Sequence, residues 1–149
     1  MRTRRWLAGT LVAAFALAGC SASGEALGEA SNAAATLDKV DGSDFDQVTL
    51  STTAYQRLGV KTTAVRPARA ATAGKATLVV PSAALLFDAE GKTWVYVETG
   101  QRSFLRTSVT LDRVAGSTAY LTDGPKVGTI VATVGVPELF GAEEGVEGE

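Results

Sequence analysis

The sequence predicts a mainly β protein: a small antiparallel β-barrel or sandwich with one short helix, preceded by a signal peptide and a disordered linker. Three observations predict this. Residues 45–140 consist of short β-branched and aromatic runs separated by Gly, Pro and Asp, as is typical of antiparallel strands and turns. Within them, residues 92–111 alternate as the two arms of a hairpin do. Residues 1–44 have a different composition, that of an export signal and a linker.

Residues 1–19 have the parts of a signal peptide, namely a start with three arginines and an apolar run at Trp6–Leu17. This run of twelve residues is shorter than the roughly 20 residues that span a bilayer. The following tetrapeptide, Leu17–Cys20, resembles the lipobox of bacterial lipoproteins, which implies a diacylglycerol on Cys20. The alternative is an ordinary thiol after an ordinary signal peptide. We expect a lipid-anchored protein on the extracytoplasmic face of the cell membrane.

Residues 20–44 are expected to form a flexible linker that carries the lipid. They are rich in Ser, Ala, Gly, Asp and Glu, and their larger apolar residues are Leu27, Leu37 and Val40. So few apolar side chains cannot offset the entropy lost on ordering. The alternative is a helix over residues 25–37, which the alanines favour although a clear apolar stripe is missing.

The folded domain is predicted to begin with a strand and one short helix. Phe45–Leu50 has the composition of a strand. Ser51 then suits the N-cap of a two-turn helix, with Leu50 and Tyr55 placed as a hydrophobic staple. Gly59 stands where a left-handed C-cap would end that helix.

Two further strands precede the hairpin. Val60–Val65 is predicted as the second strand, Arg66–Gly74 as a loop, and Ala76–Val80 as a third strand that Pro81 ends.

The predicted hairpin pairs Lys92–Val97 with Arg102–Leu111. The tripeptide Glu98–Gly100 suits a three-residue loop with Gly100 in the left-handed position. Because side chains alternate along a strand, this pairing defines two faces. The predicted inner face carries Thr93, Val95, Val97, Leu105, Thr107, Val109 and Leu111, and the other face carries Trp94, Tyr96, Phe104 and Arg106.

The remaining predicted strands are Ala119–Leu121 and Thr129–Val134, with a turn at Thr122–Pro125 between them. Residues 141–149 combine glycines with four glutamates and are predicted to be an acidic disordered tail.

Composition limits the chemistry. Removing residues 1–19 takes away three of the 14 basic residues, so 11 remain against 16 acidic residues, a net charge of −5 that argues against nucleic-acid binding. The chain has no histidine, which removes the commonest general base and metal ligand. We therefore expect no cofactor, no metal and no enzymatic activity, with a carboxylate, lysine or tyrosine enzyme as an alternative.

The face that carries Trp94, Tyr96, Phe104 and Arg106 is the candidate partner-binding surface, because aromatic residues and Arg are enriched at protein interfaces. Its alternative is a second core layer of a small barrel or sandwich. The acidic residues Asp88, Glu90 and Asp123 could bind a cation, but their neighbouring glycines favour turns with local hydrogen bonds.

Several segments of the domain together resemble the membrane-proximal part of periplasmic adaptor subunits, also called membrane fusion proteins, of bacterial export pumps. The segments are Val48–Ser51, Leu58–Thr62, Val80–Leu85, Trp94–Val97, Phe104–Leu111 and Leu121–Val131.

The chain departs from the family in three places. Pro125 stands where the family usually has Leu, and Thr129 where it usually has Asp. Only Arg66–Gly74 occupies the position where full adaptors carry a lipoyl-like domain, a long helical hairpin and much of a barrel.

The resemblance implies an accessory of a membrane export (efflux) system that acts by protein–protein contact. An inner-membrane transporter is the expected partner. The alternative is a stand-alone envelope lipoprotein that binds a small ligand in its barrel mouth.

Overall fold

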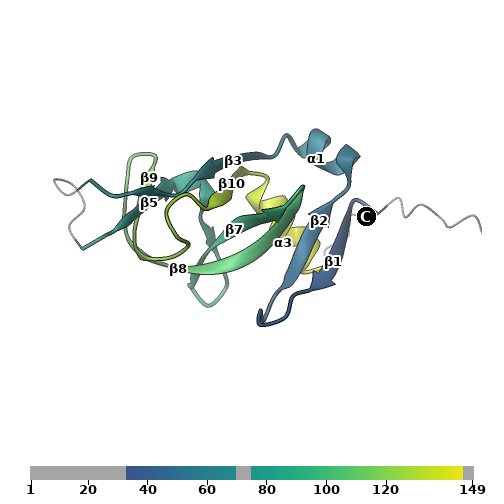
Figure 1. Ribbon diagram of the computed structural model, residues 1–149, viewed down its shortest axis with the longest axis horizontal. Coiled ribbons are helices and arrows are strands. Elements are labelled where there is room, and N and C mark those ends of the chain that lie inside the picture. Colours follow the sequence, from purple (N-terminus) through teal and green to yellow (C-terminus); the bar gives the residue numbers. More distant parts are fainter. Residues whose placement is uncertain (1–32, 70–74, 146–149) are drawn as a thin grey trace, which may run out of the picture. The chain divides into compact units, whose positions relative to one another are not determined.

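The computed structural model describes residues 33–69 and 75–145 (Figure 1). The predicted signal peptide, Cys20 and the first part of the predicted linker lie outside the described residues. The elements are β1 Ala35–Lys39, β2 Asp46–Leu50, α1 Thr52–Leu58, β3 Lys61–Ala64, β4 Arg66–Pro67, β5 Leu78–Pro81, a 3₁₀ turn at Ser82–Ala84, β6 Leu86–Phe87, β7 Thr93–Gly100, β8 Ser103–Ala115, β9 Thr118–Asp123, β10 Ile130–Val134 and α3 Val136–Glu143.

The strands form a nearly closed antiparallel barrel, which confirms the predicted fold class. Neighbouring strands follow the order β3-β10-β7-β8-β9-β5-β4. The first and last strands of this order, β3 and β4, are joined through Val65 alone, so the sheet curls back on itself. Outside this order, β2 pairs with both β1 and the start of β8, and β6 pairs with β7. The predicted strands are all present, with ends that shift by up to four residues.

Two hydrophobic cores lie on opposite sides of β7. The inner cluster fills the barrel and consists of Val65, Val80, Ala84, Val95, Val109, Ala119, Leu121 and Val131. The outer cluster consists of Val48, Leu50, Val60, Tyr96, Phe104, Ala132, Val136 and Leu139. Consecutive residues Val95 and Tyr96 are both 0 % exposed, so β7 is covered on both faces. Each such side chain contributes about 1.5–3 kcal/mol through burial.

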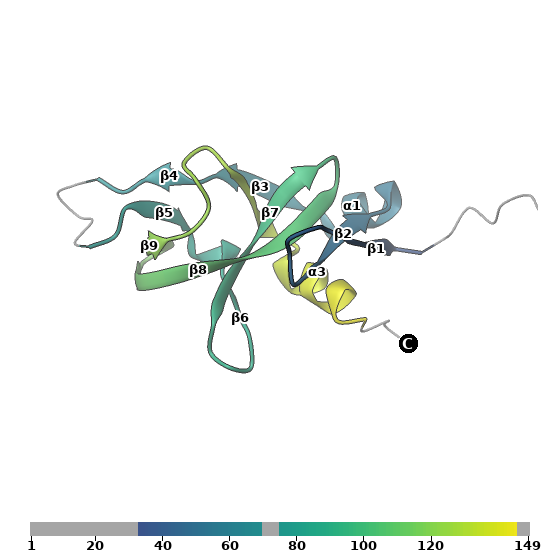
Figure 2. The ribbon, with the colours of Figure 1, turned by 60° about the horizontal axis from the view of Figure 1, so that its bottom comes forward.

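The outer cluster is closed by α1, α3 and the β1–β2 hairpin, which gather at one end of the sheet (Figures 1 and 2). As predicted, Ser51 caps α1: its side chain accepts a hydrogen bond from the amide of Ala54 at 3.1 Å. Gly59 ends the helix with a φ of 60° and a ψ of 38°, the predicted left-handed C-cap. Leu50 and Tyr55 both belong to or pack against the outer cluster, as a staple requires.

The faces of the β7–β8 hairpin are confirmed, but its predicted turn is wrong. Val95 lies opposite Thr107 and Tyr96 lies opposite Arg106, as the alternation required. Gly100, however, pairs with Ser103, and Arg102 adopts the left-handed conformation with a φ of 61°. The cause is β2 alongside. The Arg102 carbonyl accepts from the Leu50 amide at 2.9 Å, and Arg102 Nε donates to the Leu50 carbonyl at 3.1 Å.

Two parts of the domain organisation differ from prediction. Ala35–Lys39, within the predicted linker, forms β1, because its backbone pairs along the whole length of β2. Residues 141–143, placed in the predicted disordered tail, complete α3. This helix begins after Gly135 and carries Pro137 in its first turn, where proline's missing amide costs nothing. Its buried residues Val136 and Leu139 join the outer cluster.

Candidate functional site

The four residues of the candidate partner-binding face lie together, but they are covered. Tyr96 and Phe104 are 0 % exposed and Trp94 is 9 % exposed. The side chain of Arg106 is also 9 % exposed. These side chains therefore do not form an exposed surface, and the alternative of a second core layer describes this face. The physical reason is that β2 and α3 pack over this face. That packing cannot be predicted from the pattern of residues 92–111.

Arg106 holds α3 against the sheet. Its Nη2 atom forms ion pairs with Glu143 Oε1 at 3.1 Å and Glu144 Oε1 at 3.2 Å. Glu143, with a side chain 5 % exposed, also accepts a hydrogen bond from the Tyr96 hydroxyl at 2.5 Å. Charge-assisted hydrogen bonds of this kind are stronger than neutral ones. The network therefore ties the end of the last helix to adjacent strands β7 and β8.

Burial sets the protonation behaviour of this network. Desolvation raises the pKa of Glu143 above its ordinary value, although the Tyr96 hydroxyl and the Arg106 charge act in the opposite direction. Desolvation, together with the hydrogen bond to Glu143 and its charge, raises the pKa of the Tyr96 phenol. Tyr96 is therefore held as the neutral hydrogen-bond donor.

Three aromatic rings surround the guanidinium of Arg106. Its central carbon lies 4.1 Å from the ring centre of Phe45, 5.4 Å from that of Trp94 and 5.2 Å from that of Phe140. Phe45 and Trp94 also meet edge to face, with centroids 4.9 Å apart and planes at 76°. Cation–π contacts strengthen when the cation is desolvated, so this enclosure favours the charged side chain. Sequence reasoning missed Phe45 and Phe140 as members of the site.

The acidic turn before β7 fixes the other wall of the site. Asp88 Oδ2 accepts from the Trp94 indole nitrogen at 2.8 Å, while Oδ1 accepts from the amides of Glu90 and Lys92 at 3.1 and 2.7 Å. Desolvation alone would raise the pKa of Asp88, but these hydrogen bonds and the Lys92 charge outweigh it and lower that pKa. The local hydrogen-bonding role favoured by the sequence is therefore the one observed for Asp88.

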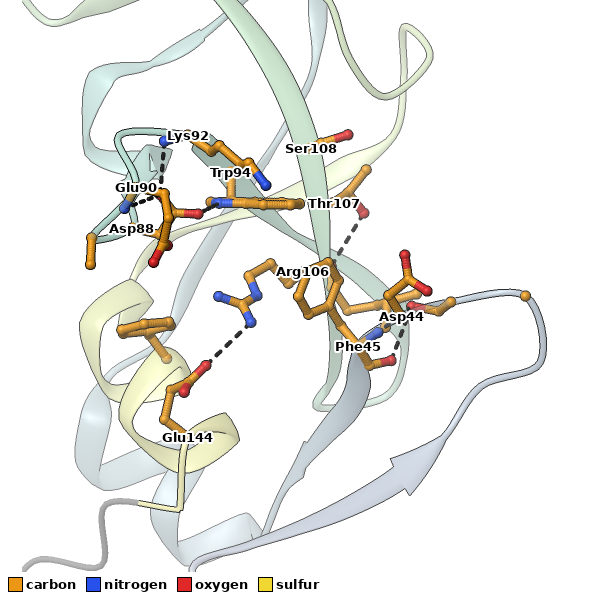
Figure 3. A pocket seen from close by; sticks show the side chains of 15 residues that line it. Asp44, Phe45, Asp88, Glu90, Lys92, Trp94, Arg106, Thr107, Ser108 and Glu144 are labelled. Carbon is orange, nitrogen blue, oxygen red and sulfur yellow. Dashed lines mark hydrogen bonds and ion pairs between the residues drawn. The ribbon is translucent and has the colours of Figure 1, made fainter.

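A cavity of about 760 Å³, open to solvent, lies outside the barrel between β8, α3 and the loops before β2 and β7. In Figure 3, Arg106 and Trp94 lie between the loop before β2, which carries Asp44, and the loop before β7, which carries Asp88. Among the described residues, the Nε atom of Arg106 is buried without a hydrogen-bond partner. The cavity is lined by Gly42, Ser43, Asp44, Phe45, Asp88, Ala89, Glu90, Lys92, Trp94, Leu105, Arg106, Thr107, Ser108, Phe140 and Glu144.

The described residues limit the chemistry of the site. In residues 33–69 and 75–145, no group of three or more His, Cys, Asp or Glu side chains could hold a metal ion. The same residues include no helix with the length and apolar character needed to cross a membrane. Comparison of the chain with protein-family models, curated proteins and solved structures gave no match. The cavity combines hydrogen-bond donors, hydrogen-bond acceptors and aromatic faces, a combination that suits the binding of a ligand.

Proposed function

We propose that this chain is a lipid-anchored, extracytoplasmic accessory of a membrane export system, which acts by contact with an integral membrane protein and without catalysis. The proposal combines the lipobox-like Leu17–Cys20 with the likeness of the β domain to the membrane-proximal part of periplasmic adaptor subunits.

The observation that carries the proposal is how the resembling segments are arranged. They correspond to β2, the end of α1 with β3, and a run from β5 to β10 that forms most of the barrel. On either side of the position where adaptors carry their large insert, β4 and β5 pair directly in this chain: Arg66 pairs with Val79, Pro67 pairs with Leu78, and the Ala68 amide donates to the Thr77 carbonyl at 2.9 Å. The barrel thus folds without an insert, as a trimmed adaptor module would require.

The alternative of a small ligand in the barrel mouth has less support. Eight buried side chains of the inner cluster fill the barrel between its strands. The cavity described above lies outside the barrel, beside β8.

The contact with a membrane partner must use a surface other than the covered face of Trp94. Exposed apolar side chains are the candidates for this contact, because clustered apolar groups that remain in water mark interaction sites. The exposed large apolar residues in the described chain are Leu37, Phe87, Val114, Val127, Ile130 and Val134.

The test has two parts. Metabolic labelling with a palmitate analogue should mark the wild-type protein and not Cys20→Ser, and label on that variant would contradict the anchor. Photo-crosslinking amino acids at Phe87 and Val127, both 56 % exposed, should then capture an integral membrane exporter in intact cells, whereas exposed Ser117 serves as the matched control. Recovery of no integral membrane protein from either position and from the other exposed apolar positions would refute the partnership.

A further inference from the structure

The long strand β8 has an interval without a partner strand on one side. Its pairing with β2 ends at Phe104, and its pairing with β9 begins at Thr110. Across the intervening residues, β7 pairs with β8 on the other side without interruption. Among the strands of the described chain, none pairs with Leu105–Val109 on the side away from β7.

The backbone direction in this interval follows from its two ends. The Arg102 carbonyl points toward β2, where it accepts from the Leu50 amide, and the Thr110 carbonyl accepts from the Thr122 hydroxyl of β9 at 3.4 Å. Because backbone groups alternate between the two sides of a strand, the N–H and C=O groups of Arg106 and Ser108 face the same open side. An unpaired edge of this kind is a template for an added strand.

The cavity described above lies along this same interval. Leu105, Arg106, Thr107 and Ser108 all line it. The side chain of Arg106 is nine-tenths buried there, yet its Nε donor has no partner among the described residues. The cavity therefore runs along the part of β8 whose backbone has no partner strand on this side.

The charge of the cavity indicates the kind of chain that fits. Four carboxylates line it, from Asp44, Asp88, Glu90 and Glu144, against the two cations Lys92 and Arg106. Two of the carboxylates, Asp44 and Glu90, belong to exposed residues on the two loops that flank the cavity. The excess of negative charge at the rim complements a basic side chain.

We infer that the open edge of β8 at Arg106–Ser108 binds an extended peptide segment that carries a lysine or arginine. The peptide backbone adds a strand beside β8, and its basic side chain meets the exposed carboxylates of Asp44 and Glu90. Binding of such a peptide follows from the cavity and the strand edge, and it does not depend on the proposed contact with a transporter.

The experiment selects random ten-residue peptides displayed on phage against the purified protein, and then measures synthetic versions of the enriched peptides by isothermal titration. We expect enrichment of alternating sequences with Lys or Arg. Ser108→Pro removes an amide that faces the open side and leaves the ladder with β7 intact, so binding should weaken at least tenfold. Ser108→Ala is the matched control and should bind as the wild type does. Glu90→Lys should weaken binding severalfold.

Amide hydrogen exchange on the wild-type protein supplies a second measurement that does not depend on how Ser108→Pro folds. Bound peptide should slow exchange at the amides of Arg106 and Ser108. Failure to enrich any binding peptide, equal affinity of Ser108→Pro and Ser108→Ala, or protection that maps away from these amides would overturn the inference. A concentration-dependent dimer that buries the same amides would also overturn it, because a second copy would then be the occupant.

Discussion

Replacing Trp94 with alanine tests whether the aromatic face is a structural layer. Trp94 is 9 % exposed, meets Phe45 edge to face and donates its indole N–H to Asp88 at 2.8 Å. Truncation of a buried Trp to Ala costs about 3–5 kcal/mol. Since whole domains have stabilities of about 5–15 kcal/mol, we expect Trp94→Ala to remove a large share of the free energy of unfolding.

Urea unfolding followed by circular dichroism measures this change. A loss of about 4 kcal/mol with a slope of about 2 kcal/mol per molar urea lowers the midpoint by about 2 M. The matched control is Phe87→Ala in the adjoining strand β6, because Phe87 is 56 % exposed and its truncation should change stability by less than about 0.5 kcal/mol. A loss below about 1 kcal/mol for Trp94→Ala, or equal losses for both variants, would refute the assignment of Trp94 to a core layer.

Four further predictions concern other parts of the domain. Val95→Asp should destabilise the protein far more than Thr110→Asp in thermal melts, since Val95 is 0 % exposed inside the barrel and Thr110 is exposed. At position 102, glycine should give a more stable protein than alanine by about 1 kcal/mol in urea, because the φ of 61° strains any residue with a Cβ. For pH, the raised pKa of Glu143 means that the folded state holds an extra proton above pH 4.5, so stability should fall as the pH rises from 4.5 through the folded pKa. The lowered pKa of Asp88 has the opposite sign, so stability should fall as the pH drops from 3.8 through its folded pKa. The test is the urea midpoint measured across pH. Glu143→Gln should abolish the loss of stability above pH 4.5, and Asp88→Asn should abolish the loss below pH 3.8. An unchanged profile in either variant would contradict the corresponding assignment.

The elements that local physics controls could be predicted from sequence. Ser51 and Gly59 mark the ends of α1 because capping depends on a few adjacent residues. The two faces of the β7–β8 hairpin follow from the period of two, which every strand shares. The prediction of the turn failed at Arg102, because its conformation is determined by hydrogen bonds to Leu50, which is 52 residues away along the chain.

Helix α3 illustrates a different limit. Pro137 two residues after Gly135 is a recognisable signal for a helix start, and it could have identified the element. The glutamates that follow suggested a solvated tail, which is the usual meaning of such a composition. Glu143 is instead buried, because Arg106 and Tyr96 supply its partners from strands far away along the chain. Partners this far apart along the chain cannot be recognised from the residues next to Glu143.

Arg106 belongs both to the ion pairs that hold α3 and to the lining of the cavity beside β8. A buried ion pair is weak support for stability by itself, because desolvation offsets much of the attraction, but removal of one partner leaves the other charge uncompensated and costs about 3–5 kcal/mol. Substitution of Arg106 would therefore release Glu143 and disturb α3 at the same time as it altered the cavity. Ser108, two residues along β8, shares the open edge without joining the ion-pair network, so changes there separate peptide binding from the integrity of the fold.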